Sequence, residues 1–375
     1  MTTAANAVTR VLVVDDSAFM RKAISIMLES DPQIKVVGQA RDGEEAIEKV
    51  RELKPDLVTL DVEMPRMDGL AALRQIMKSD PTPVMMISSI TTAGAEATLE
   101  ALELGAIDFI PKQMSYVSLD IVKIKEELLT KIKDIARRKH LLMAQYRQRE
   151  FARSGRVPIS LAGKQAPTST SAPGCTPVIP IIRRRNHSIH IVAVGSSTGG
   201  PPALSTLFSK LPGKLPVGVV VAQHMPAQFT KTLAERLDSL CSLTVREAVD
   251  GEKIEPGLVL IAPGGLNMTV KRRGGDAFVS VSPEPVSTLY KPCVDVMMNS
   301  VADTFGQATL GVILTGMGNN GVHGVRNVKE RGGVIVAQNE QTCIVYGMPR
   351  AVIDAGLADH IAAIDDIPAE IASYF

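Results

Sequence analysis

Apolar and polar positions alternate in blocks along the first 112 residues. Five short runs are almost continuously apolar and rich in β-branched residues, as is typical of parallel strands covered on both faces. They are RVLVVDD, KVVGQA, DLVTLD, PVMMISS and DFIPK. The segments between them follow helical spacing, and two open on an aspartate that can cap a helix, Asp42 and Asp68. Five strand–helix units predict a doubly wound α/β domain.

The same rhythm returns after residue 187. We predict strands at 189–196, 218–223, 257–262, 309–315 and 333–337, and helices at about 201–210, 227–240, 293–305, 321–331 and 347–355. The stretch MTVKRRGGDAFVSV predicts a hairpin that turns at Gly274 and Gly275. These elements favour a second, Rossmann-like α/β domain with a largely parallel sheet.

A different pattern separates the two domains. Residues 120–153 predict a long basic helix with apolar positions at helical spacing: Ile121, Ile124, Leu128, Ile132 and Ile135. Residues 154–182 are dense in Pro, Ser, Thr and Gly, a composition that cannot bury enough apolar surface to order itself. We therefore predict domains at 1–119 and 187–375, joined over 120–186 by a helix and a flexible linker.

The overall net charge of +1 is unevenly distributed. Residues 1–115 hold 12 Lys and Arg against 18 Asp and Glu, residues 116–186 hold 15 against 5, and the remainder holds 14 against 17. The basic middle is most simply a solvated helix face, and the alternative is attachment to an acidic protein array or an anionic membrane surface. The acidic second domain lacks a helix-turn-helix unit, which argues against nucleic acid as a partner.

Cysteine spacing and hydropathy indicate a cytoplasmic protein. The four cysteines are far apart and form no C-x-x-C pair, which fits a reducing compartment and predicts neither a disulfide framework nor a zinc site. The first ten residues lack the apolar stretch of a secretory signal, and no run approaches the ~18 apolar residues of a membrane span.

Charged and hydroxyl groups end the strands of the first domain. Asp15 and Asp16 follow the first strand, Asp61 the third, Ser88 the fourth and Lys112 the fifth. In a doubly wound sheet these ends converge on one crevice. Three carboxylates repel one another unless a hard cation such as Mg²⁺ neutralises them, and a lysine with a hydroxyl suits a transferred phosphoryl group. The alternative for each aspartate is a surface helix cap.

The stretches VVDD, LDVEMPRMDG, MISS and FIPK resemble the receiver domain of two-component response regulators, a flavodoxin-like fold. The resemblance implies that Asp61 accepts phosphate from a histidine kinase. It also implies a Mg²⁺ ion held by Asp16, Asp61 and the backbone carbonyl of Glu63, with Asp15 acting through water.

The same resemblance assigns the remaining receiver positions. Ser88 and Lys112 would contact the phosphoryl group, and Phe109 matches the family's switching aromatic residue. Receivers usually carry proline after the lysine, whereas this chain has Gln113.

In the second domain, IVAVGSSTGG leads a strand into a turn of small residues and then a helix. The P-loop motif requires a lysine that is absent here. A serine in such a turn is well placed for nucleophilic attack, with backbone N–H groups nearby to stabilise an oxyanion. His224 ends the next strand, in GVVVAQHMP, and is the best placed of six histidines to act as its base.

The stretches GSSTGG, QHMP, IAPGG, KPCVDVMMNSVA, GVILTGMGNNG and AQNEQTCIVYGMPRAVI resemble the catalytic domain of chemotaxis protein-glutamate methylesterases. The resemblance implies hydrolysis of γ-glutamyl methyl esters on methyl-accepting chemoreceptors, often deamidation of receptor glutamines, and no cofactor in this domain. It implies Ser197 as the nucleophile rather than Ser196, His224 as the base, and backbone of Met317 near the oxyanion.

This chain departs from the family at position 320, where Asn320 stands in place of the usual aspartate. An amide lacks the charge that stabilises a protonated histidine and can hold the imidazole in the wrong tautomer, a change that costs roughly 10⁴ in turnover in a serine protease. Three compensations are open. Another carboxylate such as Asp295 could reach His224, or Asn320 could deamidate to aspartate next to Gly321. The third is that orientation of His224 without a negative charge suffices for an accessible ester. The competing hypothesis is a catalytically impaired, receptor-binding response regulator that acts as a phosphate sink.

Overall fold

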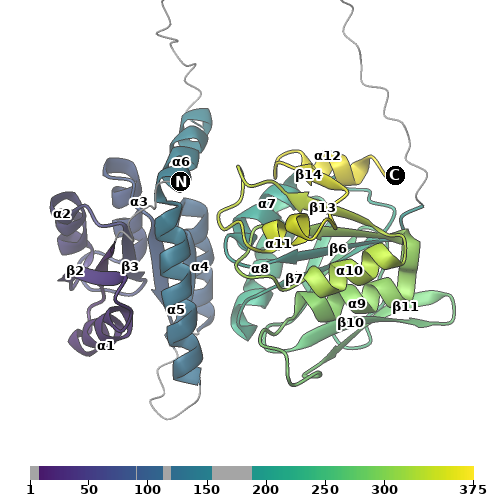
Figure 1. Ribbon diagram of the computed structural model, residues 1–375, viewed down its shortest axis with the longest axis horizontal. Coiled ribbons are helices and arrows are strands. Elements are labelled where there is room, and N and C mark those ends of the chain that lie inside the picture. The colour runs from purple at the N-terminus through teal and green to yellow at the C-terminus, as the bar shows by residue number, and fades with distance from the viewer. Residues whose placement is uncertain (1–7, 90, 113–119, 154–187) are drawn as a thin grey trace, which may run out of the picture.

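The computed structural model describes residues 8–89, 91–112, 120–153 and 188–375, which form two α/β domains (Figure 1). The strands of the first domain are β1 (Thr9–Val14), β2 (Ile34–Ala40), β3 (Leu57–Asp61), β4 (Val84–Ser88) and β5 (Asp108–Pro111). They pair in parallel in the order β2-β1-β3-β4-β5, the flavodoxin-like order. This confirms the doubly wound prediction for the first domain.

Four helices connect these strands: α1 (Ala18–Glu29), α2 (Gly43–Leu53), α3 (Gly69–Ser79) and α4 (Thr92–Leu104). The two predicted aspartate caps are confirmed. Asp42 accepts a hydrogen bond from the N–H of Glu45, and Asp68 accepts one from the N–H of Ala71. Such caps satisfy N–H groups that have no partner within the helix.

The basic segment forms two helices, α5 (Asp120–Arg137) and α6 (Lys139–Arg153), where we predicted one. The break falls at Arg138, whose N–H bonds to the carbonyl of Ile135, three residues back, instead of continuing the α-helical ladder. Leu128, Ile132 and Ile135 are buried, as their spacing predicts. The predicted linker at 154–182 lies outside the described residues.

Part of the basic charge of α5 and α6 is paired with the acidic first domain. Three lysines pair with receiver-side carboxylates: Lys131 with Asp108, Lys133 with Asp31 and Lys139 with Asp56, at 2.9, 2.6 and 3.0 Å. The interpretation of this segment as a solvated face is therefore wrong for these lysines, because they neutralise part of the acidic first domain.

The second domain has a seven-stranded, wholly parallel sheet in the order β14-β13-β12-β6-β7-β9-β8. Its strands are β6 (Ile191–Ser196), β7 (Gly218–Gln223), β8 (Thr244–Glu247), β9 (Leu258–Ile261), β12 (Thr309–Ile313), β13 (Val334–Gln338) and β14 (His360–Ala362). The five predicted strands are confirmed, whereas β8 and β14 were not foreseen.

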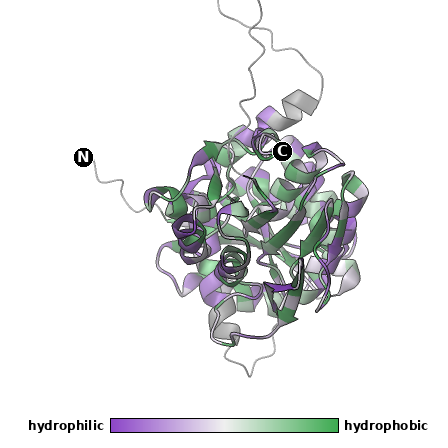
Figure 2. Cartoon of the chain, turned by 90° about the vertical axis from the view of Figure 1, so that its right-hand side faces the viewer, coloured by the Kyte–Doolittle hydropathy of each residue, from purple (hydrophilic) through white to green (hydrophobic). Residues whose placement is uncertain are grey.

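The predicted hairpin is confirmed as β10 (Asn267–Arg273) paired with β11 (Asp276–Ser282), and β10 packs against α9 (Val294–Phe305). The helices of this domain are α7 (Gly200–Lys210), α8 (Ala227–Leu240), α9 (Val294–Phe305), the 3₁₀ turn η1 (Gly306–Ala308), α10 (Val322–Glu330), α11 (Met348–Asp354) and α12 (Ile367–Ala372). Figure 2 shows apolar residues concentrated in the central strands, with hydrophilic residues toward the outside.

The receiver-side helices α4 and α5 face the second domain (Figure 1), and α4 packs against α7 and α8. Buried apolar residues of the first domain join those on one face of the second sheet in a continuous cluster. Glu103 on α4 and Arg236 on α8 form an ion pair across this boundary. In the part of the chain that the structure describes, no helix is both long and apolar enough to cross a membrane.

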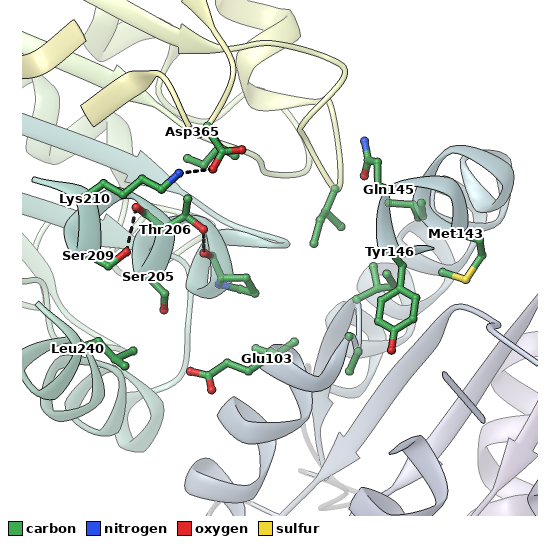
Figure 3. A pocket seen from close by; sticks show the side chains of 18 residues that line it. Glu103, Met143, Gln145, Tyr146, Ser205, Thr206, Ser209, Lys210, Leu240 and Asp365 are labelled. Atoms are coloured by element: carbon green, nitrogen blue, oxygen red, sulfur yellow. Dashed lines mark hydrogen bonds and ion pairs between the residues drawn. The ribbon is translucent and has the colours of Figure 1, made fainter. Parts of the chain in front are cut away.

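A half-open cavity of about 750 Å³ also lies at the interface (Figure 3). Glu103 of α4 and Tyr146 of α6 line it on one side, and Lys210 of α7, paired with Asp365 at 2.6 Å, lies on the other. The continuous apolar cluster therefore leaves part of the boundary between the two domains unfilled.

Candidate functional site

The predicted acidic cluster is assembled at the strand ends of the first domain. Carboxylate oxygens of Asp15, Asp16 and Asp61 lie within 4.8 Å of one another. Lys112 places its ammonium 2.6 Å from Asp61 and 3.0 Å from Asp15. Asp15 and Asp61 are buried while Asp16 is exposed. Three carboxylates that converge in this way could bind a hard divalent cation.

Burial controls the electrostatics of Asp61. Desolvation raises its pKa to about 6, against the opposing effect of Lys112. Lys112 contacts Oδ2 of Asp61, and the backbone N–H of Glu63 donates to Oδ1 of Asp61 at 3.3 Å. A cation or an added positive group beside Asp61 would therefore relieve an unfavourable buried charge.

The Ser88 hydroxyl faces α4. It donates to the carbonyl of Gly94 at 3.1 Å and accepts a hydrogen bond from Thr98 at 2.7 Å. In this structure these hydrogen bonds tie the Ser88 hydroxyl to α4. Gln113, the departure from the receiver pattern, lies outside the described residues.

The second group of predicted residues lies at the ends of three adjacent strands, β12, β6 and β7. Ser197 follows β6, His224 follows β7, and the loop after β12 carries Met317 and Asn320. Ser197, His224 and Met317 line one cavity of about 560 Å³. Gly316 must be glycine, because a Cβ there would lie 2.4 Å from Met348 and 2.9 Å from the Cβ of Ser197.

Gln223 is a buried residue of this site that sequence reasoning missed. Its side-chain carbonyl accepts from Ser196 at 2.6 Å, and its amide donates to the backbone carbonyls of Ser197 and His224 at 2.9 and 3.2 Å. The signal was its place directly before His224. Gln223 ties the serine turn to the histidine loop, and it assigns Ser196 a structural role.

His224 is held on one edge and one face. Its Nε2 lies 3.0 Å from Oδ1 of Asn320, and its ring stacks on Tyr290 with centroids 4.5 Å apart. Its Nδ1 is buried and has no hydrogen-bond partner among the described residues. Burial lowers the pKa of His224 to about 4, against the opposing hydrogen bond from Asn320. The ring is therefore neutral at pH 7, with Nδ1 available to accept a proton.

Asn320 makes further hydrogen bonds at the start of α9. Its Oδ1 accepts from the N–H of Val294 at 2.8 Å, and its Nδ2 donates to Oδ2 of Asp295 at 2.9 Å. Asp295 was considered as a carboxylate that reaches His224. The structure instead places it against Asn320, one hydrogen bond further from the ring.

The receiver contributes residues to the same cavity. Asp108, Phe109, Glu127 and Lys131 line it together with the serine and the histidine. Thr198, next to the serine, donates to Asp108 at 2.6 Å. Lys131 bonds Asp108 and Glu127 at 2.9 and 2.8 Å, and although burial opposes it, these two carboxylates raise the pKa of Lys131. A charged network from the first domain therefore forms part of the wall of this cavity.

A receiver-type acidic site joined to a serine–histidine cavity defines a response regulator with an enzymatic output domain. Comparison with known families agrees on both halves. The profile of the response regulator receiver domain matches residues 11–121, and that of CheB methylesterase matches residues 192–371.

Relatives match along nearly the whole chain. Protein-glutamate methylesterase/protein-glutamine glutaminase 1 of Oleidesulfovibrio alaskensis is 50% identical, with 96% of this chain and 97% of the relative covered. The protein of the same name numbered 2 from Nitratidesulfovibrio vulgaris is 51% identical, with 96% and 98% covered. The crystal structure of the Thermotoga maritima CheB methylesterase catalytic domain is 42% identical, covering 50% of this chain and all of that one, with a TM-score of 0.49. The chain belongs to the protein-glutamate methylesterase family.

Proposed function

We propose that this protein hydrolyses glutamyl methyl esters on methyl-accepting chemoreceptors, with Ser197 as nucleophile and His224 as base. The observation that carries the proposal is the placement of both residues at adjacent parallel strand ends in one cavity, with the histidine held by Asn320. The names of the relatives support the substrate class.

The reaction follows from these groups. The Ser197 hydroxyl attacks the ester carbonyl while Nδ1 of His224 takes its proton, and backbone N–H groups near Met317 stabilise the oxyanion. Collapse of the tetrahedral intermediate breaks the bond to the methoxy group, which leaves as methanol with the proton from His224. Water, deprotonated by His224, then attacks the acyl-serine and releases the glutamate carboxylate and the free serine.

Phosphorylation of Asp61 by a histidine kinase would open the site. Asp16, Asp61 and the backbone carbonyl of Glu63 would hold a Mg²⁺ ion, with Asp15 acting through water, and the bound ion would supply charge neutralisation for the phosphoryl oxygens. Lys112 and Ser88 would contact the same oxygens. Contact between Ser88 and the phosphoryl group would draw its hydroxyl away from α4, the helix that packs on α7 and α8. The receiver-derived lining of the cavity supports a closed state before phosphorylation.

The test is methanol release from methylated receptor by wild type, Ser197→Ala and Ser205→Ala, each with and without a phosphodonor. Ser205 lies on α7, where its hydroxyl bonds only the carbonyl of Pro201 among the described contacts, so its replacement is a matched control. We expect loss of activity in Ser197→Ala alone. Equal activity of all three proteins would instead favour a receptor-binding phosphate sink.

Two further measurements refine the proposal. Deletion of residues 1–186 should raise the basal rate, and a truncated domain no faster than the unphosphorylated chain would contradict gating. Deamidation of receptor glutamines, which the names of the relatives include, should be slower than ester hydrolysis, because an amide leaving group needs more proton transfer from His224.

A further inference from the structure

Asn320 cannot rotate its amide without losing hydrogen bonds on both edges. Its oxygen accepts from the N–H of Val294, a group that can only donate. Its nitrogen donates to Asp295 and, at 3.2 Å, to the sulfur of Cys293. A flipped amide would set N–H against N–H at Val294 and oxygen against carboxylate at Asp295, so the amide oxygen must face His224.

Asp295 is itself fixed between two helices. It lies in the first turn of α9, and its second oxygen, Oδ1, accepts from the N–H of Gly324 on α10 at 2.8 Å. The helices lie close together here: a Cβ on Gly324 would lie 2.4 Å from the side chain of Met298 and 2.9 Å from the carbonyl oxygen of Asp295. The carboxylate is therefore part of a packed helix pair and not a mobile surface group.

The orientation of the amide decides which nitrogen of His224 carries the proton. An amide oxygen facing Nε2 can only accept, so Nε2 must hold the hydrogen and Nδ1 the lone pair. The reverse orientation would present an N–H group to Nε2 and favour the tautomer that cannot take a proton at Nδ1. That inverted tautomer is the reason an amide in this place is so damaging in serine proteases.

We propose that Asp295 is a positioning residue for the ester hydrolysis, which acts through Asn320 to fix His224 in the tautomer that serves Ser197. Asp295 also places a negative charge one hydrogen bond beyond Asn320, on the Nε2 side of the His224 ring. This charge would stabilise the imidazolium that forms when His224 takes the proton of Ser197. The aspartate missing from position 320 is thus replaced by an amide and a carboxylate acting together. This proposal rests on the proposed esterase function.

Asp295→Asn removes the charge and one acceptor. The introduced amide has one oxygen for two donors, the N–H of Gly324 and the amide of Asn320, so Asn320 is driven toward the reverse orientation. Asp295→Asn combined with Asn320→Asp restores every bond except the one to Cys293: the introduced amide donates to the introduced carboxylate and accepts from Gly324, while that carboxylate accepts from Val294 and His224. Asp303→Asn, which removes an exposed carboxylate from the last turn of the same helix, is the matched control.

The kinetic test measures methanol release by the full-length, phosphodonor-treated chain. We expect Asp295→Asn to lower kcat about 100-fold with KM little changed, the double variant to recover to within about tenfold of wild type, and Asp303→Asn to match wild type. A double variant as slow as Asp295→Asn, or Asp295→Asn as fast as Asp303→Asn, would overturn the proposal.

A second readout does not depend on turnover. In chains carrying ¹⁵N-labelled histidine, the ring signals of His224, assigned by their absence in His224→Gln, report the tautomer directly. We expect a proton on Nε2 in wild type and in the double variant, and a loss of that preference in Asp295→Asn. A wild type with the proton on Nδ1, or an unchanged tautomer in Asp295→Asn, would contradict the positioning role even if no ester were hydrolysed. A wild type that shows the expected tautomer but releases no methanol would instead refute the esterase function alone.

Discussion

Phe109 of the receiver and Phe229 of the second domain stack on each other, with ring centroids 4.5 Å apart and an interplanar angle of 18°. Phe109 lies on β5, three residues before Lys112, and Phe229 lies in the first turn of α8, which begins three residues after His224. The pair therefore links the acidic cluster of one domain to the loop that carries the candidate base of the other.

Loss of this aromatic contact should favour the open state. An aromatic pair contributes about 0.5–1.5 kcal/mol beyond its buried area, so Phe229→Leu should raise basal methanol release by about 2- to 10-fold and reduce the stimulation by phosphodonor. Phe278→Leu, in the hairpin, is the control. A basal rate equal to that of wild type would show that the stacking does not hold the domains together.

Lys131→Met should open the site more strongly. It leaves the buried carboxylate of Asp108 without its ion-pair partner, and loss of one partner of a buried pair is destabilising by about 3–5 kcal/mol. The Glu127 carboxylate also loses its partner, but its side chain is 41% exposed, so water screens its charge and it contributes less. Opening returns both carboxylates to water, so we expect a basal rate at least about tenfold above wild type. Lys133→Met, which breaks the ion pair with Asp31 within the first domain, should leave the rate unchanged. Equal rates in the two variants would refute this account.

Asp61 should make stability depend on pH. Because its pKa is raised to about 6 from 3.8, the folded state binds a proton more tightly than the unfolded state between these values. Stability is therefore greatest below about pH 4 for this group and falls as pH rises toward 6. Asp61→Asn should raise the free energy of unfolding of the first domain at pH 7.5 by up to about 3 kcal/mol, with little gain at pH 4.

Urea unfolding at both pH values, followed by a probe in the first domain, measures this difference. Asp16→Asn removes a neighbouring but exposed carboxylate and is the control. Mg²⁺ should stabilise wild type at pH 7.5 more than Asp61→Asn, because the ion binds the folded site. An equal stability gain from Asp61→Asn at both pH values would contradict the assigned pKa shift.

His224 should titrate differently in the closed and open states. Burial lowers its pKa to about 4 in the closed state, so the ring stays neutral as pH falls from 7 to 5. Opening exposes the ring to water and removes the adjacent Lys131, and its pKa should rise toward the ordinary value of about 6.5. Titration of the His224 ring by NMR, with and without a phosphodonor, measures both values. A midpoint near 6.5 without phosphodonor would exclude the buried, closed arrangement.

Much of the fold could be predicted because apolar runs and strand-end residues are local features of the chain. The alternation of strands and helices, the Gly274–Gly275 turn and the placement of Ser197 and His224 at one cavity all follow from these local features. The strand β8 was missed because its four residues, TVRE, lie at the sheet edge and include a single apolar residue, too few for a periodic signal. The break at Arg138 was missed because helical periodicity continues on both sides of it.

The partners of individual side chains could not be predicted in the same way. Lys131 belongs to a helix that looks merely basic, and its role depends on how two domains dock. Asp295 was recognised as a nearby carboxylate, but its target depends on the packing of α9 against α10. Such contacts join residues distant in sequence, for which a single chain offers no periodic signal.

The shared cavity has a consequence for how the receiver and the receptor affect each other. Asp108, Phe109, Glu127 and Lys131 line the cavity that the proposed function assigns to the receptor glutamate. Under the proposed gating, the closed position of the receiver and a bound receptor therefore compete for the same face of the second domain. Thermodynamic linkage then requires reciprocity: whatever factor phosphorylation adds to receptor affinity, bound receptor must add to the equilibrium phosphorylation of Asp61. A methylated receptor would thus be an activator of its own demethylation as well as its substrate.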